Sequence, residues 1–184
     1  MTSHSLKEKY LLYKVRYQHD AGAYGLLYDA YVDKIFRFVL YKVSSVEDAE
    51  DITAEVFLKS WQFIRTTNKR VSNLNALLYR IARNAVIDYY RQKKRQDLPL
   101  TDEDQYRDIV DSRDVERDID LKLEVKNIER ALDRIKDDYR EVIILRYVED
   151  MSINEIASII NKSKSNVRVL LHRAIKRIQE ILSE

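Results

Sequence analysis

Hydrophobic residues recur at every third or fourth position along most of the chain, which is the spacing of amphipathic helices. In the first half of the sequence this period predicts helices over residues 23–43, 45–64 and 73–94. In the second half it predicts helices over 122–135, 139–148 and 152–160, and a last helix that begins after Ser163. Only Gly22, Gly25 and Pro99 interrupt residues that favour helices, and hairpin signals such as Asn-Gly or Asp-Gly are absent. The sequence therefore predicts an all-α fold.

One segment breaks this pattern. Residues 96–120 contain ten acidic residues, only three basic ones and the single proline. Because this segment has few aliphatic residues to bury, we expect it to be an extended acidic linker. The chain would then consist of two small helical domains, residues 1–95 and 121–184, joined by the linker over 96–120. A plain solvated spacer is the alternative interpretation of this linker.

Charge and composition narrow the function. The chain has 33 basic and 31 acidic residues, so a binding signal must lie in how the charges are distributed. Cysteine is absent and the three histidines lie far apart, which excludes disulfides and cysteine-based zinc sites and predicts no metal or cofactor. No apolar run approaches the roughly 20 residues that span a bilayer. We therefore expect a cytoplasmic protein without membrane insertion.

The helix predicted over 45–64 has one apolar side and one mixed side. Its predicted core positions are Ala49, Ile52, Thr53, Val56, Phe57, Ser60, Phe63 and Ile64. The mixed side is acidic, with Asp51 and Glu55 among its carboxylates, yet it also carries Ala54, Leu58 and Trp61. A purely solvated face would rarely combine Leu and Trp, although single exposed apolar residues are common. The two interpretations are a solvated face and a docking face for another protein.

The helix predicted over 73–94 has a basic and aromatic outer side. Its predicted core positions are Leu74, Leu78, Ile81, Ala82, Ala85 and Tyr89. Its predicted outer positions are Tyr79, Arg80, Arg83, Asn84, Arg91, Lys93 and Lys94. Basic groups can pair with phosphates while aromatic rings stack on unpaired bases. This surface predicts contact with nucleic acid, with a solvated basic face as the alternative.

The last two predicted helices have the pattern of a helix-turn-helix. Ser152 and Glu155 form a capping box at the start of the first helix, Asn161 stands at the turn, and Ser163 can cap the second helix. The predicted buried stripe of the second helix is Val167, Leu171, Ala174, Ile178 and Ile181. The positions left for DNA are Ser165, Asn166, Arg168, Val169, His172, Arg173 and Lys176. The second helix of this motif enters the major groove. A solvated basic helix is the alternative.

Four blocks of this sequence together resemble the bacterial RNA polymerase sigma factors of the extracytoplasmic-function (ECF) class of the sigma-70 family. The blocks are AEDITAEVFLKSW (49–61), LLYRIARNAVIDYYR (77–91), REVIILRYVEDMSINEIA (140–157) and SNVRVLLHRA (165–174). They occur in the order of that family. The resemblance implies two promoter-binding domains, the second a winged-helix-like, four-helix domain with the helix-turn-helix. It also implies a non-enzymatic subunit that directs promoter-specific transcription initiation.

The resemblance further implies what each surface binds. The helix over 45–64 would dock on the clamp helices of the largest polymerase subunit through Asp51, Ala54, Glu55, Leu58 and Trp61. The next helix and the loop before it would read and melt the minus-ten promoter element by capturing an extruded base, through Lys69, Arg70, Tyr79, Arg80, Arg83, Asn84 and Arg91. The last helix would read the minus-thirty-five element as duplex DNA through Ser165, Asn166, Arg168, Val169, His172, Arg173 and Lys176.

Other partners are implied by the same resemblance. They are the flap of the second-largest polymerase subunit and an anti-sigma factor, which could hold the protein at the membrane, while the linker would thread the RNA exit channel.

The sequence also departs from the family pattern. Ala54 stands where Gln is usual, Leu77 where Trp is usual, Asn161 where Gly is usual, and Leu170 where a basic residue is common.

Two other classes of function fit parts of the sequence. A repressor or activator would use the last helix on duplex DNA and the first domain to dimerise, but it has no need for the basic and aromatic side of the helix over 73–94. A magnesium-dependent nuclease could use Glu47, Asp48, Glu50 and Asp51, but these carboxylates fan around one helix instead of converging from different elements. The sequence therefore favours the promoter-specificity subunit.

Overall fold

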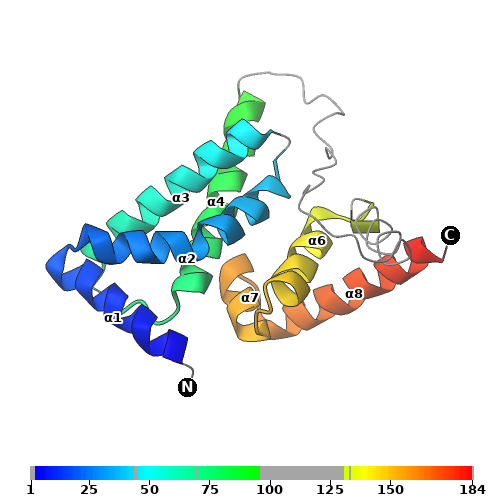
Figure 1. Cartoon of the computed structure of the whole chain (residues 1–184). Helices are drawn as coiled ribbons and strands as arrows, with labels where there is room; N and C mark the ends of the chain where they lie inside the picture. Colours follow the sequence, from blue (N-terminus) through cyan, green and yellow to red (C-terminus); the bar gives the residue numbers. More distant parts are fainter. Residues whose placement is uncertain (1–2, 44, 69, 96–130, 133, 184) are drawn as a thin grey trace, which may run out of the picture. The chain divides into compact units, whose positions relative to one another are not determined.

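The structure is a computed structural model that describes residues 3–43, 45–68, 70–95, 131–132 and 134–183 (Figure 1). The chain divides into two compact units, Met1–Asp104 and Gln105–Glu184. All regular structure in the described residues is helical, as the sequence predicts. The predicted linker over 96–120 and most of the helix predicted over 122–135 lie outside the described residues.

The described part of unit 1 folds into helices that pack around a common core. These helices are α1 (Ser3–Gln18), α2 (Ala21–Leu40), α3 (Val46–Thr66) and α4 (Leu74–Arg95). α3 and α4 lie side by side, and both pack against α2 (Figure 1). Phe38 of α2 and Leu78 of α4 are among the side chains that are fully buried between these helices. The predicted helices over 23–43, 45–64 and 73–94 are confirmed, with shifts of a few residues at their ends.

Polar side chains set the starting points of α2 and α3. The Asp20 carboxylate accepts a hydrogen bond from the Ala23 backbone N–H at 2.9 Å, and Ser45 Oγ accepts one from the Asp48 N–H at 3.2 Å. Lys14 forms a 2.7 Å ion pair with Asp20. The hydrogen bond and charge of Lys14 hold the pKa of the Asp20 carboxyl below its usual value. The carboxylate therefore stays ionised, which suits a group at the positive end of a helix.

Three predicted core positions of unit 1 lie at its rim instead. Phe63, in the last turns of α3, is 40% exposed, and Ile81 and Tyr89 of α4 are half-buried. The Tyr89 hydroxyl donates a 2.8 Å hydrogen bond to Asp48 Oδ2, so this ring spans the edge between α4 and α3. Helical periodicity places these residues on the correct side but does not say how far the neighbouring helices extend over them.

The first helix, α1, was missed by the sequence analysis, which predicted no element before residue 23. Leu11, Leu12 and Val15 of α1 are buried against the rest of unit 1, while the rings of Tyr13 and Tyr17 are exposed. The outer side of α1 carries aromatic rings as well as charged groups. The two faces of this helix therefore differ little in hydrophobicity, and its period is hard to detect. The adjacent Leu pair followed by Val15 was the signal available in the sequence.

Unit 2 contains the predicted helix-turn-helix. Its described elements are α6 (Asp137–Ile143), a π-helical turn η2 (Ile144–Val148), α7 (Ile153–Ile160) and α8 (Lys164–Leu182). α6 and α7 both pack against α8. A cluster of apolar side chains joins α8 to α6 and to the chain before α6, and it consists of Ala131, Leu132, Ile135, Tyr139, Ile178 and Ile181. The described residues form no strand, so no β wing accompanies these helices there.

The helix predicted over 139–148 differs from the observed one in two ways. It begins earlier, at Asp137, and its second half is the π-helical turn η2. Arg140 of α6 is only 4% exposed, and its Nε donates a 2.7 Å hydrogen bond to the Leu132 carbonyl. Burial lowers the pKa of this guanidinium to about 10, so it stays charged at neutral pH. Arg140 thereby ties the start of α6 to the preceding segment of the chain.

The connection from α7 to α8 has the predicted capping geometry. Ser152 Oγ accepts from the Glu155 N–H, and Glu155 Oε2 accepts from the Ser152 N–H at 2.8 Å, which confirms the capping box. Asn161 adopts the left-handed conformation, with φ of 53° and ψ of 47°. Ser163 then caps α8 by accepting from the Asn166 N–H at 3.2 Å. The turn therefore depends on a residue that tolerates positive φ.

We expect Asn161→Ala to reduce the free energy of unfolding of unit 2 by about 1 kcal/mol. Any β-carbon is strained in the left-handed region, and alanine lacks the short polar side chain with which Asn can form compensating local hydrogen bonds. Asn161→Gly should preserve or slightly increase stability, since glycine has no such strain. Thermal unfolding of the full chain, followed by circular dichroism, measures both variants. Equal stability of the Ala and Gly variants would contradict this account of the turn.

Candidate nucleic-acid and protein interfaces

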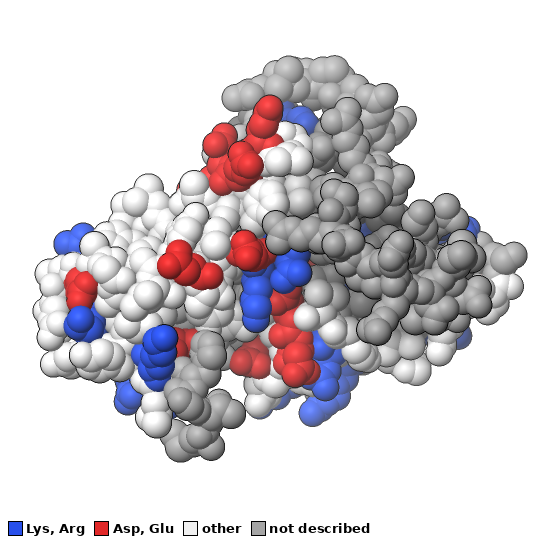
Figure 2. Space-filling model, viewed as in Figure 1, with Lys and Arg blue, Asp and Glu red and all other residues white. Residues whose placement is uncertain are grey.

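The mixed side of α3 is exposed from Asp51 to Leu58. The opposite side of α3, which includes Val56 at 0% and Phe57 at 4% exposure, faces the core. Asp51, Ala54 and Glu55 are therefore exposed to solvent. Figure 2 shows a group of acidic side chains over the end of unit 1 where α3 begins. Among these exposed positions Leu58 is 57% exposed. An exposed apolar side chain surrounded by polar groups matches the apolar centre and polar rim of protein–protein interfaces.

Tyr24 of α2 fixes the position of α3 behind this face. Its hydroxyl donates to the Phe57 carbonyl and also lies 2.6 Å from Ser60 Oγ. Burial raises the pKa of the Tyr24 phenol, so the group remains a hydrogen-bond donor. The Tyr24 ring packs at the edge of the Trp61 ring, with their centroids 4.9 Å apart, and the Arg65 guanidinium lies 5.1 Å from the Trp61 ring. Trp61 is therefore half-buried, and only part of this predicted docking residue is accessible.

The structure corrects the predicted orientation of Tyr79. This side chain was expected on the outer side of α4, but it is 0% exposed, and its ring packs against the Phe38 ring with centroids 5.0 Å apart. α4 contacts both α2 and α3, so two adjacent stripes of the helix are buried instead of one. Leu77, which is 6% exposed, also belongs to this wide buried arc. Tyr79 is therefore part of the core in this structure and does not form an exposed stacking surface.

Four of the other predicted minus-ten residues lie on one basic face of α4. Arg80 and Asn84 are exposed one turn apart, and Arg83 beside them is half-buried. Arg91 is exposed further along the same helix and lies 3.4 Å from Asp88. In the loop before α4 the side chain of Arg70 is exposed, whereas Lys69 lies outside the described residues. The face can offer cations to phosphates and the Asn84 amide to a base edge.

All predicted DNA-contacting residues of α8 are exposed. They are Ser165, Asn166, Arg168, Val169, His172, Arg173 and Lys176. Val167, Leu171 and Ala174 are buried beneath them, and Ile178 is half-buried. Leu170, which stands where the family often has a basic residue, is half-buried. Because Ser163 starts α8, the first residues of this face occupy the helix end that enters the groove in a helix-turn-helix.

Within the described residues, no three His, Cys, Asp or Glu side chains come together in a way that could hold a metal ion. None of the helices in the described part of the chain is long and apolar enough to cross a bilayer.

Comparisons with known proteins agree with the geometry of both units. The family model of sigma-70 region 2 matches residues 27–96, and that of sigma-70 region 4 matches residues 126–178. The ECF RNA polymerase sigma factor SigW of Bacillus subtilis is 31% identical over 90% of this chain and 91% of its own length. The ECF RNA polymerase sigma factor BldN of Streptomyces coelicolor is 30% identical over 90% of this chain, which spans 62% of the length of BldN.

A solved structure has a similar fold. It is the co-crystal structure of the sigma factor RpoE with the anti-sigma factor NepR from Bartonella quintana, with 24% sequence identity and a TM-score of 0.68. The similarity covers 86% of this chain and 96% of that one. On the family models and the identity to SigW, the present chain belongs to the ECF sigma factors of RNA polymerase.

Proposed function

We propose that this protein binds core RNA polymerase and directs transcription initiation at a specific set of promoters. The observation that carries the proposal is the match of one chain, in order, to sigma-70 regions 2 and 4. The exposed faces of α3, α4 and α8 support it, because each has the chemistry expected for its partner. The protein would select promoters by binding alone, without catalysing a reaction.

The polymerase would be bound chiefly by α3. The clamp helices of its largest subunit would meet Asp51, Ala54, Glu55 and Leu58, with the accessible edge of Trp61 at the end of this surface. Leu58 would supply the apolar centre of the interface, and the carboxylates would pair with basic groups of the clamp. In unit 2, contact with the flap of the second-largest subunit is a further part of the proposal.

The promoter would be melted by capture of an unpaired base at the surface formed by α4 and the loop before it. Arg70, Arg80, Arg83 and Arg91 would hold the phosphates, and the Asn84 amide would bond to the edge of the extruded base. Binding energy released by this capture would oppose the cost of unpairing and unstacking. Since Tyr79 is buried, the stacking that single-strand binding normally uses must come from other rings of unit 1.

The minus-thirty-five element would be read as duplex DNA by α8. Ser165, Asn166, Arg168 and Val169 lie near the start of the helix and would approach base edges, while Arg173 and Lys176 would meet phosphates. The protein would work in the cytoplasm. An anti-sigma factor is proposed as a regulatory partner, because the RpoE structure contains one and ECF sigma factors commonly have such partners.

A reconstituted transcription assay tests the proposed function. The full chain is added to purified core polymerase with fragments of its own genome, and the transcripts are sequenced. We expect a limited set of start sites that depends on the added protein and does not need ATP hydrolysis for melting. The absence of both core binding and specific transcripts would rule out the proposal.

Single substitutions on α8 should separate base reading from phosphate binding. We expect Arg168→Ala to weaken binding to duplex promoter DNA by about 1–3 kcal/mol, and Arg173→Ala to reduce the slope of log affinity against log salt by about 1. Arg177→Ala is the matched control, because Arg177 is exposed on the same helix and is paired with Glu180 at 3.1 Å. Fluorescence anisotropy over a range of salt concentrations measures all three. An equal effect of Arg177→Ala would indicate nonspecific charge alone.

A further inference from the structure

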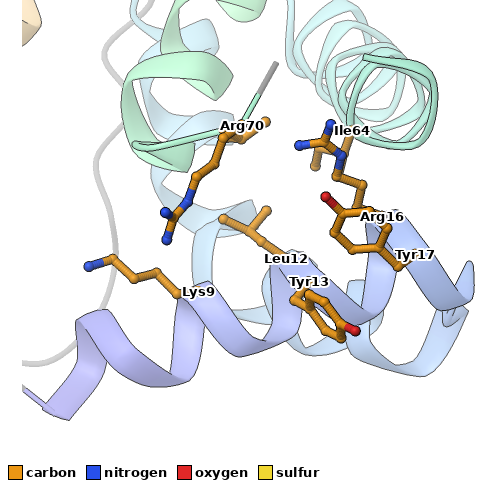
Figure 3. Close-up of a pocket in the computed structure, with 8 residues that line it drawn as sticks. Lys9, Leu12, Tyr13, Arg16, Tyr17, Ile64 and Arg70 are labelled. Carbon is orange, nitrogen blue, oxygen red and sulfur yellow. The ribbon is translucent and has the colours of Figure 1, made fainter. Parts of the chain in front are cut away.

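Unit 1 contains a hollow between α1 and the loop that leads into α4. Its volume is about 320 Å3. We call it the α1 hollow, and it is lined by Lys9, Leu12, Tyr13, Arg16, Tyr17, Ile64, Arg70 and Val71. Figure 3 shows the Arg70 side chain pointing toward α1, while Lys9 and Arg16 extend from α1 on either side of Leu12.

The lining has the chemistry of a nucleotide site. It contains basic side chains at Lys9, Arg16 and Arg70, and no acidic residue. The Tyr13 and Tyr17 rings lie 4.9 Å apart at an angle of 44° and are 53% and 61% exposed. Cations for phosphates combined with exposed rings for stacking are the elements of single-strand binding surfaces. Leu12 and Ile64 give the hollow an apolar base, which can pack against the edge of a nucleobase ring.

The position of the hollow connects it to the proposed promoter surface. Arg70 belongs both to the hollow and to the loop that precedes α4, where unpaired DNA is proposed to bind. α1 itself ends at Gln18, before the part of the chain that matches sigma-70 region 2, which begins at residue 27. The hollow therefore shares Arg70 with the loop before α4, and its other wall is a helix outside the matched region.

We propose that the α1 hollow binds one unpaired nucleotide of the nontemplate DNA strand, next to the nucleotides held by α4, with its base stacked on Tyr13. This inference rests on the proposed function and deepens it by naming α1 as part of the single-strand site. A paired base is stacked inside the duplex and exposes only its edge, so the ring of Tyr13 selects unpaired DNA. The volume is near the lower end of the range for small-ligand sites, which suits a single nucleotide.

The test measures binding of the full chain to a fluorescein-labelled single-stranded DNA oligonucleotide by fluorescence anisotropy at low salt. We expect Tyr13→Ala to weaken binding about 5-fold to 100-fold, which is the usual effect of removing one stacking ring. Tyr13→Phe should bind like the parent chain, because the ring remains. Tyr10→Ala is the matched control, since Tyr10 is 61% exposed on the same helix but does not line the hollow.

The role of charge is tested in the same way with a matched lysine pair. Lys9→Ala should weaken oligonucleotide binding, whereas Lys7→Ala, which removes the same charge from an exposed position outside the hollow, should have a smaller effect. Duplex DNA and polyglutamate serve as competitors without unpaired bases. We expect both to displace the labelled oligonucleotide poorly from the parent chain.

Each outcome supports or overturns the inference. It is overturned if the parent chain does not bind the oligonucleotide, if Tyr13→Ala binds like the parent, or if Tyr10→Ala loses as much affinity. Equal displacement by duplex DNA or polyglutamate would show simple attraction of anions and would also overturn it. If the parent chain still directs specific initiation with core polymerase, the proposed function stands without this inference. If the parent chain does not, the proposed function itself fails.

Discussion

The double variant Asp51→Lys, Glu55→Lys is expected to bind core polymerase about 100-fold more weakly than the parent chain. Both carboxylates are exposed one turn apart on α3, beside the exposed Leu58. Reversing two charges would replace attraction by repulsion against a basic partner surface, and like charges placed together at an interface cost several kcal/mol. A 100-fold loss corresponds to about 2.7 kcal/mol. Titration of labelled protein with core polymerase measures the affinity.

The control for this variant is a second reversal on another helix. Asp29→Lys, Asp33→Lys makes the same change in total charge at two exposed positions of α2 that are also one turn apart. We expect it to bind core polymerase nearly as well as the parent chain. The affinity of the α3 variant for minus-thirty-five duplex DNA should also be unchanged, because that DNA is assigned to α8. Equal losses in both double variants would contradict a specific docking face on α3.

The second large effect is expected at Tyr79. This side chain is completely buried and packs edge-on against Phe38, so Tyr79→Ala leaves a cavity in the centre of unit 1. Removing a buried aromatic ring costs about 3–5 kcal/mol, a large part of the stability of a small domain. Urea unfolding can be followed through the fluorescence of Trp61, which is the only tryptophan of the chain and lies in unit 1. The midpoint should fall sharply.

Tyr79→Phe distinguishes the structural role from the role that the sequence suggested. It keeps the ring in the core, so we expect oligonucleotide binding like that of the parent chain and a much smaller loss of stability than Tyr79→Ala. A stacking residue on the surface would behave differently, because Tyr79→Ala would weaken DNA binding while the unfolding midpoint stayed the same. That second pattern would refute the burial of Tyr79.

The two units differ in how well their surfaces could be predicted. On α8 the positions expected to face DNA are exposed, and Val167, Leu171 and Ala174 are buried as predicted. On α4 the same reasoning located Arg80 and Asn84 correctly but not Tyr79. The chemistry of the aromatic ring was the misleading signal, because Tyr suits both a stacking surface and a core. The roles of these residues in binding remain predictions for the experiments described above.

What the sequence by itself determined was local. Helix periods, the capping box at Ser152 and the left-handed turn at Asn161 depend on residues close together in the chain, so the sequence indicates them directly. Only the tertiary structure decided how many neighbours each helix has. Because α4 packs against two helices, its buried arc extends to Tyr79. Because α1 packs on the other helices of unit 1, Tyr13 and Tyr17 on its outer side line a hollow together with Arg70. These contacts join residues far apart in the sequence, and no local pattern encodes them.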